Sequence, residues 1–241
     1  MFPWNGSPGS QSASSGNGSG PSATFGNATL NTLVDSVLAY YPGSTLNEQN
    51  VADKGFLRPL GTGVSTVDGK TRIAESAGVK KLFAAIPGDF RQYTTWVPYT
   101  ISFKIDPARL TTSPSGDFLQ ACSGSAPFGL VVNFSNTNLL RIHTGITGYV
   151  GFADTGGSLF VGPGTEEQVS FICRLEAGVP TLILRVGGVT KFTWAGLTVI
   201  GDINGLVFTH PGDYRDIYFF NTGLTDAQET LLASHNYTPT N

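Results

Sequence analysis

The chain has 241 residues, of which only 13% are charged, and its formal net charge is −3. Its 14 lysines and arginines are scattered rather than clustered, which argues against a nucleic-acid-binding face. No apolar stretch approaches the roughly 20 residues that a membrane-spanning helix requires. Two cysteines, Cys122 and Cys173, are too few for a disulfide-dense scaffold or a Cys-rich zinc site. We expect two buried thiols on strands, with one disulfide bridge as the alternative.

The first 26 residues differ in composition from the rest of the chain. Six glycines and seven serines fill half of these positions, and none of the 26 residues is charged. Such a segment buries too little apolar surface to offset its ordering entropy, so we expect a flexible arm over residues 1–26 and a folded domain over residues 27–241. Phe2, Pro3 and Trp4 form an apolar tip, which we interpret as an assembly anchor. The segment lacks the basic and apolar regions of a secretory signal, so we expect the chain either to stay inside the cell or to leave it by another route, such as lysis.

The start of the folded domain fits two local structures. Asn27 or Thr29 could cap a helix, whose apolar residues would be Leu30, Leu33, Val34, Val37 and Leu38 before Pro42 and Gly43 end it. Residues 37–41 fit a strand equally well, because they are apolar and aromatic. The sequence therefore leaves helix and strand open at this position.

The middle of the chain has the signature of an all-β domain. Apolar residues alternate over residues 99–105, and Asp106 and Pro107 are expected to end that strand. Turn residues separate the later strands, including the glycine pair Gly187–Gly188, which predicts a tight hairpin. Strands at intervals of about ten residues without intervening helices indicate a sandwich or a barrel. The further strands are expected over residues 129–134, 139–143, 148–152, 169–175, 181–186 and 189–194.

The end of the chain combines a strand, a turn and a short helix. Residues 216–221 are expected to form a strand, and Thr222, Gly223 and Leu224 follow as a turn. Thr225 and Gln228 have the spacing of a capping box, which predicts a helix over about residues 226–234.

This ending resembles the concanavalin A-like, laminin-G-like sandwich family, whose members often close with a strand, an Asn, a Leu and a short capped helix. The order of further segments is also similar to that family: residues 37–41 as its opening strand, 100–103 as its central strand and 182–188 as a strand that ends in a glycine turn. The resemblance spans roughly residues 37–240. It implies an antiparallel jelly-roll β-sandwich, and it carries no function by itself.

Within this family the chain looks most like the virion proteins of bacteriophages, because it combines an uncharged Gly/Ser arm, low charge and no secretory signal. We therefore expect a non-enzymatic structural protein of a virus particle, such as a capsid decoration or tail appendage protein, which contacts other virion proteins and forms a homo-oligomer. The alternative is a carbohydrate-binding adhesin that recognises a host-surface glycan. Capsid and tail locations stay open.

The sequence contains no recognisable catalytic motif, so we expect a non-enzymatic protein. Glycosidases of this fold use carboxylates two positions apart on one strand, and no such cluster occurs here. The three histidines, His143, His210 and His235, share no metal-ligand spacing and support no nucleophile motif. We expect all three to be structural, with His210 in a turn before Pro211 and Gly212.

Two sets of residues remain as candidate binding sites. Trp96, Tyr99 and Trp194 could stack on a sugar face, although core packing is the alternative for each. Asp202, Asn204 and Asp213 carry oxygens that suit calcium at the rim of a sandwich. No cofactor is expected apart from this calcium alternative.

Overall fold

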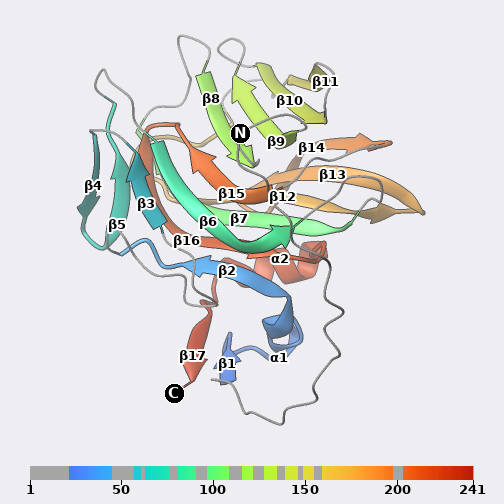
Figure 1. The fold of residues 1–241 in the computed structure, drawn as a ribbon, viewed down its shortest axis with the longest axis horizontal. Helices are drawn as coiled ribbons and strands as arrows, with labels where there is room; N and C mark the ends of the chain where they lie inside the picture. The colour runs from blue at the N-terminus through green and yellow to red at the C-terminus, as the bar shows by residue number, and fades with distance from the viewer. Residues whose placement is uncertain are drawn as a thin grey trace, which may run out of the picture.

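The computed structural model describes residues 22–44, 57–60, 63–75, 81–90, 97–108, 116–121, 128–134, 139–145, 149–154, 159–197 and 203–240. Over these residues the chain forms two large antiparallel β-sheets that pack on each other (Figure 1). Short helices and a two-stranded sheet lie against the outer face of one of them. The all-β antiparallel sandwich predicted from the sequence is therefore confirmed.

The first large sheet has the strand order β14-β13-β12-β7-β16-β5-β4, and β2 also pairs with β16. Its strands are β2 (Val37–Tyr41), β4 (Val64–Val67), β5 (Lys70–Ile73), β7 (Tyr99–Pro107), β12 (Glu167–Glu176), β13 (Val179–Val186), β14 (Val189–Ala195) and β16 (Gly212–Phe220). We call this the long sheet.

The second large sheet has the order β11-β10-β9-β8-β15-β6-β3. Its strands are β3 (Leu57–Leu60), β6 (Lys81–Phe90), β8 (Gly116–Ala121), β9 (Phe128–Phe134), β10 (Leu139–Gly145), β11 (Tyr149–Asp154) and β15 (Ile203–Phe208). All its pairings are antiparallel. Successive side chains along a strand point to opposite faces, so each sheet has an inner face toward the other sheet and an outer face.

The core lies between the two sheets, and β7 shows how the sequence builds it. Its alternate residues Tyr99, Ile101, Phe103 and Ile105 are fully buried in the shared core. The ring of Phe103 contacts Phe118 of β8 and Phe208 of β15, across the sandwich. The intervening residues of β7 are polar and face the other side of the sheet, which we call the outer face. Aromatic contacts of this kind add to the burial of apolar area.

The predicted strands appear at their expected places, but several of them are longer than predicted. The strand expected over residues 216–221 is β16, which already begins at Gly212 and ends at Phe220. The strand over residues 99–105 does not stop at Asp106 but continues through Pro107, which pairs with Gly212 of β16. Proline is compatible with extended backbone, and it fits at a strand end where its missing N–H leaves no bond unmade. The N–H of the next residue, Ala108, donates to the Pro211 carbonyl oxygen at 3.1 Å.

The predicted hairpins and the C-terminal helix are confirmed. Gly187 and Gly188 have φ angles of 56° and 77°, as the tight turn between β13 and β14 requires. Helix α2 (Asp226–Leu232) begins after Thr225, which forms a capping box with Gln228. No helix in the described part of the chain is long and apolar enough to span a membrane.

The start of the domain contains both structures that the sequence left open. Helix α1 (Ala28–Asn31) is capped by the side chain of Asn27, and a 3-10 turn, η1 (Val34–Ser36), follows it. Residues 37–41 then form strand β2. The helix is short because β16 offers residues 37–41 a row of partners, and tertiary pairing overrides weak local helix propensity.

The boundary between arm and domain lies earlier than the sequence predicts. Strand β1 (Ser22–Thr24) pairs with β17 (Thr238–Thr240), and the buried ring of Phe25 packs against Tyr218 and Tyr237. Residues 22–26 therefore belong to the folded domain. The Gly/Ser-rich average composition of residues 1–26 did not indicate this, because a single residue, Phe25, supplies the buried apolar area.

Candidate functional site: a polar groove on the outer face

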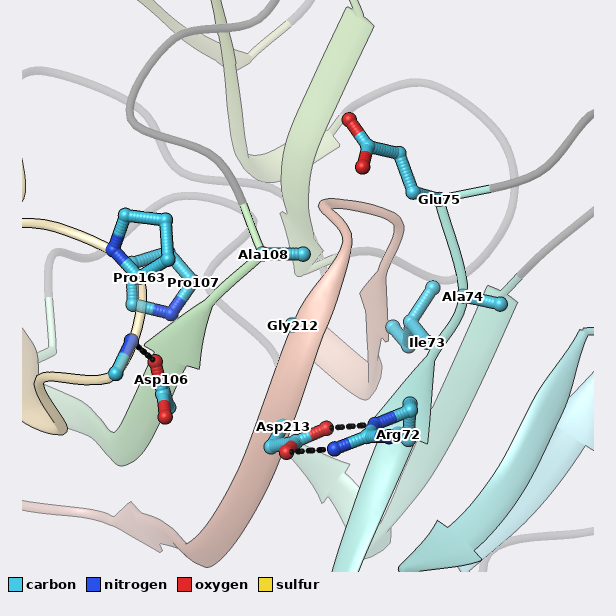
Figure 2. A pocket seen from close by; sticks show the side chains of 11 residues that line it. Arg72, Ile73, Ala74, Glu75, Asp106, Pro107, Ala108, Pro163, Gly212 and Asp213 are labelled. Carbon is cyan, nitrogen blue, oxygen red and sulfur yellow. Dashed lines mark hydrogen bonds and ion pairs between the residues drawn. The ribbon is translucent and has the colours of Figure 1, made fainter.

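A groove of about 370 Å³ opens where β5, β7 and β16 meet the segment that precedes β12. In the view of Figure 2, Arg72 and Asp213 lie on one side of it, Glu75 on another, and Pro107 and Pro163 on the side across from them. The remaining lining residues are Ile73, Ala74, Asp106, Ala108, Gly164 and Gly212. None of the lining residues is aromatic, and four of them are charged.

The sheet register places three of the charged residues in one row. Asp213 of β16 lies opposite Arg72 of β5 on one side and opposite Asp106 of β7 on the other. Their neighbours in sequence, including Ile73, Ile105 and Tyr214, are buried in the core. Because side chains alternate along a strand, these three charged residues face outward. Directly opposite side chains are close enough to interact.

Arg72 and Asp213 form a bidentate ion pair. The Nε and Nη2 atoms of Arg72 donate to Oδ1 and Oδ2 of Asp213, both at 2.6 Å (Figure 2). The hydrogen bond to Asp213 and the charge of that carboxylate raise the pKa of the Arg72 guanidinium above its ordinary value. The Asp213 side chain is 16% exposed and that of Arg72 is 45% exposed, so the aspartate lies at the base of the pair and the arginine faces solvent.

Asp106 fixes the opposite wall of the groove. Its Oδ1 atom accepts a hydrogen bond from the backbone N–H of Gly164 at 2.8 Å, which ties the segment before β12 to the end of β7 (Figure 2). Asp106 and Asp213 nevertheless face each other across the strand pair, and like charges in that position are unfavourable. Such a local conflict with stability is typical of a functional site.

Gly212 forms the floor of the groove and leaves no space for a side chain. A Cβ atom at this position would lie 2.7 Å from the Asp106 carbonyl oxygen and 3.1 Å from the Ile105 side chain. The glycine lets β7 and β16 approach closely at the point where their carboxylates meet.

Further along the outer face, polar side chains are covered by other elements. Glu229, a buried residue of α2, accepts hydrogen bonds from Ser170 of β12 and Arg185 of β13 at 3.0 and 2.9 Å. Nearer the groove, the buried Asp216 accepts from Tyr40 of β2 and pairs with Lys104, each at 3.0 Å. These groups bond to one another and hold elements in place, whereas the groove is open to solvent beside Arg72.

The structure places Tyr99 and Trp194, two of the predicted sugar-stacking residues, apart from this groove. Tyr99 is fully buried and stacks on Phe219 in the core, which corrects its proposed role because no ring face is exposed. Trp194 lies on the edge strand β14 and is half-buried against the core. Trp96 and the predicted anchor Phe2, Pro3 and Trp4 lie outside the described residues.

The predicted calcium ligands do not assemble where the structure describes them. Asn204 lies at the start of β15 in the second sheet, whereas Asp213 follows the turn at the other end of that strand and belongs to the long sheet. Asp213 is engaged by Arg72 instead, and Asp202 lies outside the described residues. Within the described ranges no group of three or more His, Cys, Asp or Glu side chains could hold a metal ion.

The described histidine and cysteine side chains have structural surroundings. His210 is buried beside the rings of Phe118 and Phe160, in the turn that the sequence predicts. The Nδ1 atom of His235 lies 2.9 Å from the Leu231 carbonyl oxygen. Cys173 is a buried thiol on β12, and Cys122 lies outside the described residues.

Sequence reasoning missed Arg72 and Asp106, and it assigned Asp213 to a different kind of site. The local sequence gives little indication of a binding site, because each of these residues is a single charged residue on a strand and belongs to no motif. What joins them is the pairing of residues 70–73 and 99–107 with residues 212–220, which are distant in the chain.

Comparisons with known proteins give likeness of fold only. No family model matches the chain, and no curated protein matches it. Among solved structures, it is similar to the botulinum neurotoxin serotype D binding domain, with a TM-score of 0.64 at 13% identity over 84% of this chain and 52% of that one. Similar values hold for the serotype D ligand binding domain in complex with N-acetylneuraminic acid (0.65, 12%, 86% and 52%) and for the binding domain of neurotoxin DC in complex with rat synaptotagmin II (0.62, 13%, 84% and 52%).

These likenesses place the chain among β-sandwich domains. The chain spans about half the length of the neurotoxin domains it matches. What those domains bind is therefore a property of those proteins, and the groove has to be interpreted from its own residues.

Proposed function

We propose that the protein is a non-enzymatic glycan-binding module and that the groove beside Arg72, Asp106 and Asp213 is its binding site. The observation that carries the proposal is the in-register row of these three side chains at the open part of the outer face. The similar solved structures are binding domains, one of them in complex with N-acetylneuraminic acid, and this supports the proposal.

The chemistry of the groove suits a polyhydroxylated ligand. Carboxylate oxygens accept hydrogen bonds from sugar hydroxyls, and guanidinium N–H groups donate to them. Glu75 and Arg72 supply such groups on two sides, and Pro107 and Pro163 supply apolar surface for the C–H face of a sugar ring. Convergent polar groups beside some apolar surface are a feature of small-ligand sites.

A catalytic role fits this geometry less well. A glycosidase needs two carboxyl groups directed at the scissile bond, one as acid and one as base or nucleophile. Here both oxygens of Asp213 are directed at Arg72, and Asp106 holds the backbone of Gly164. Because these oxygens bond to protein groups, Asp106 and Asp213 are not arranged as the acid and base pair of a glycosidase.

A glycan panel tests the proposal. The wild-type full chain should bind at least one oligosaccharide saturably and leave it intact after long incubation. Arg72→Ala and Glu75→Gln should weaken that binding, whereas Lys191→Ala and Glu176→Gln make the same charge changes on exposed positions outside the groove and should not. Absence of binding across neutral, amino and acidic glycans would contradict the proposal, and hydrolysis would contradict its non-enzymatic part.

A second candidate function is the structural role in a virus particle that the sequence suggests. The observation that favours it is the firm attachment of residues 22–26, where β1 pairs with β17 and Phe25 packs in an aromatic cluster. An N-terminal arm can hold the domain to a neighbouring subunit only if the end of the arm is held firmly by the domain, as residues 22–26 are here. The two functions are compatible, since a particle-surface protein can also bind a glycan.

Deletion of residues 1–21 tests this second candidate. It keeps β1 and Phe25, so the domain should retain its thermal stability while incorporation into particles is lost. Normal incorporation of the folded deletion variant would contradict the tether.

A further inference from the structure

The Nε–Nη2 edge of the Arg72 guanidinium, which could bind an anionic ligand, is paired with Asp213 of the same chain. A guanidinium recognises a carboxylate most strongly through two parallel N–H···O bonds in a fork. The fork of Arg72, formed by Nε and Nη2, is filled by the two oxygens of Asp213 at 2.6 Å. A sugar carboxylate would have to displace Asp213 to reach this fork.

The other charges of the groove also oppose an acidic ligand. The lining contains one guanidinium, of Arg72, and three carboxylates, of Glu75, Asp106 and Asp213, so its formal charge is 1 − 3 = −2. A sialic acid, uronic acid or sulfate group would meet like charge there, and juxtaposed like charges suppress binding of the wrong partner.

We infer that Asp213 determines the charge class of the ligand: by filling the fork of Arg72, it excludes acidic glycans and reserves the groove for glycans without carboxylate, sulfate or phosphate groups. This inference rests on the proposed glycan-binding function of the same groove. One of the similar structures, by contrast, is a complex with an acidic sugar, N-acetylneuraminic acid.

The test compares matched pairs of immobilised oligosaccharides, each neutral glycan beside its sialylated or uronic counterpart. The wild-type chain should prefer the neutral member by about tenfold or more. Asp213→Ala removes one carboxylate and frees the fork of Arg72, so it should reduce that preference by about tenfold or reverse it. Asp213→Asn keeps the side-chain shape and should change the preference in the same direction.

Glu176→Gln is the matched control, because it removes one carboxylate at the far end of β12 and should leave the ratio unchanged. Thermal unfolding of each variant shows that it is folded. Equal or tighter wild-type binding of the acidic members overturns the inference alone, as does an unchanged ratio in folded Asp213→Ala. If the wild-type chain binds no glycan of either kind, the proposed function fails and this inference fails with it.

Discussion

Glu229 is a buried carboxylate whose oxygens are shared among several side chains. Its Oε1 atom accepts from Ser170 and Gln168 at 3.0 and 3.3 Å, and its Oε2 atom accepts from Arg185 at 2.9 Å. Arg185 and Glu229 are both buried, so removal of Glu229 leaves the buried Arg185 with the more exposed Asp226, 2.7 Å away, as its charged partner.

We therefore expect Glu229→Ala to lower the free energy of unfolding by about 3–5 kcal/mol. Urea denaturation followed by tryptophan fluorescence measures this change. Glu229→Gln keeps the contacts with Ser170 and Gln168 and should cost less. A loss under about 1 kcal/mol for Glu229→Ala would show that the pair adds little beyond packing.

Glu166 makes stability depend on acid pH. Burial alone would raise its pKa, but hydrogen bonds from Arg215 and Lys70, together with their charges, outweigh that effect and lower the pKa from 4.5 to about 2. The folded pKa is thus below the unfolded one, so the contribution of Glu166 to stability is present above pH 4.5 and is lost as the pH falls toward 2.

Urea unfolding of the wild type and of Glu166→Gln between pH 2 and 6 measures this contribution. The wild type should be the more stable protein near pH 6, and the difference should shrink as the pH approaches 2. A difference that stays constant across this range would contradict the assignment.

At the scale of elements, local signals in the sequence predicted local structure well. The alternation in β7, the glycine pair before β14 and the capping box of α2 each involve neighbours in the chain, so physical rules of short range suffice. Strand β2 and the true start of the domain were harder to predict. They depend on pairing with β16 and β17, which the local sequence does not specify.

The capping box of α2 gives a prediction at this scale. The Thr225 hydroxyl accepts from the Gln228 N–H at 3.2 Å, so Thr225→Ala should lower the free energy of unfolding by about 1 kcal/mol. Thr230→Ala, a matched change at an exposed position inside the same helix, should cost little because alanine favours helix. Urea denaturation compares the two, and equal losses would contradict a capping role for Thr225.

At the scale of the whole molecule, the candidate site depends on contacts that are remote in sequence. Arg72, Asp106 and Asp213 come from three strands, and only the order β7-β16-β5 brings them into one row. Their types were visible in the sequence, but their register was not. The fold class could therefore be predicted from pattern, whereas the groove required the structure.

The same topology separates the groove from the attachment region. The groove lies where β16 begins, at Gly212 and Asp213, and the cluster around Phe25 contacts the other end of that strand, at Tyr218 and Phe220. A protein tethered through residues 22–26 would keep the groove accessible, so binding and anchoring can operate together.

The most direct test of the account is to locate a bound glycan by backbone amide NMR shifts of the full chain. Titration with the best ligand from the glycan panel should shift the amides of Arg72, Gly164 and Gly212, which surround the groove, and should leave those of β14 near Trp194 unchanged. Saturable shifts at Trp194, with the groove amides unchanged, would contradict this assignment. They would show that the glycan binds at the edge strand β14 instead.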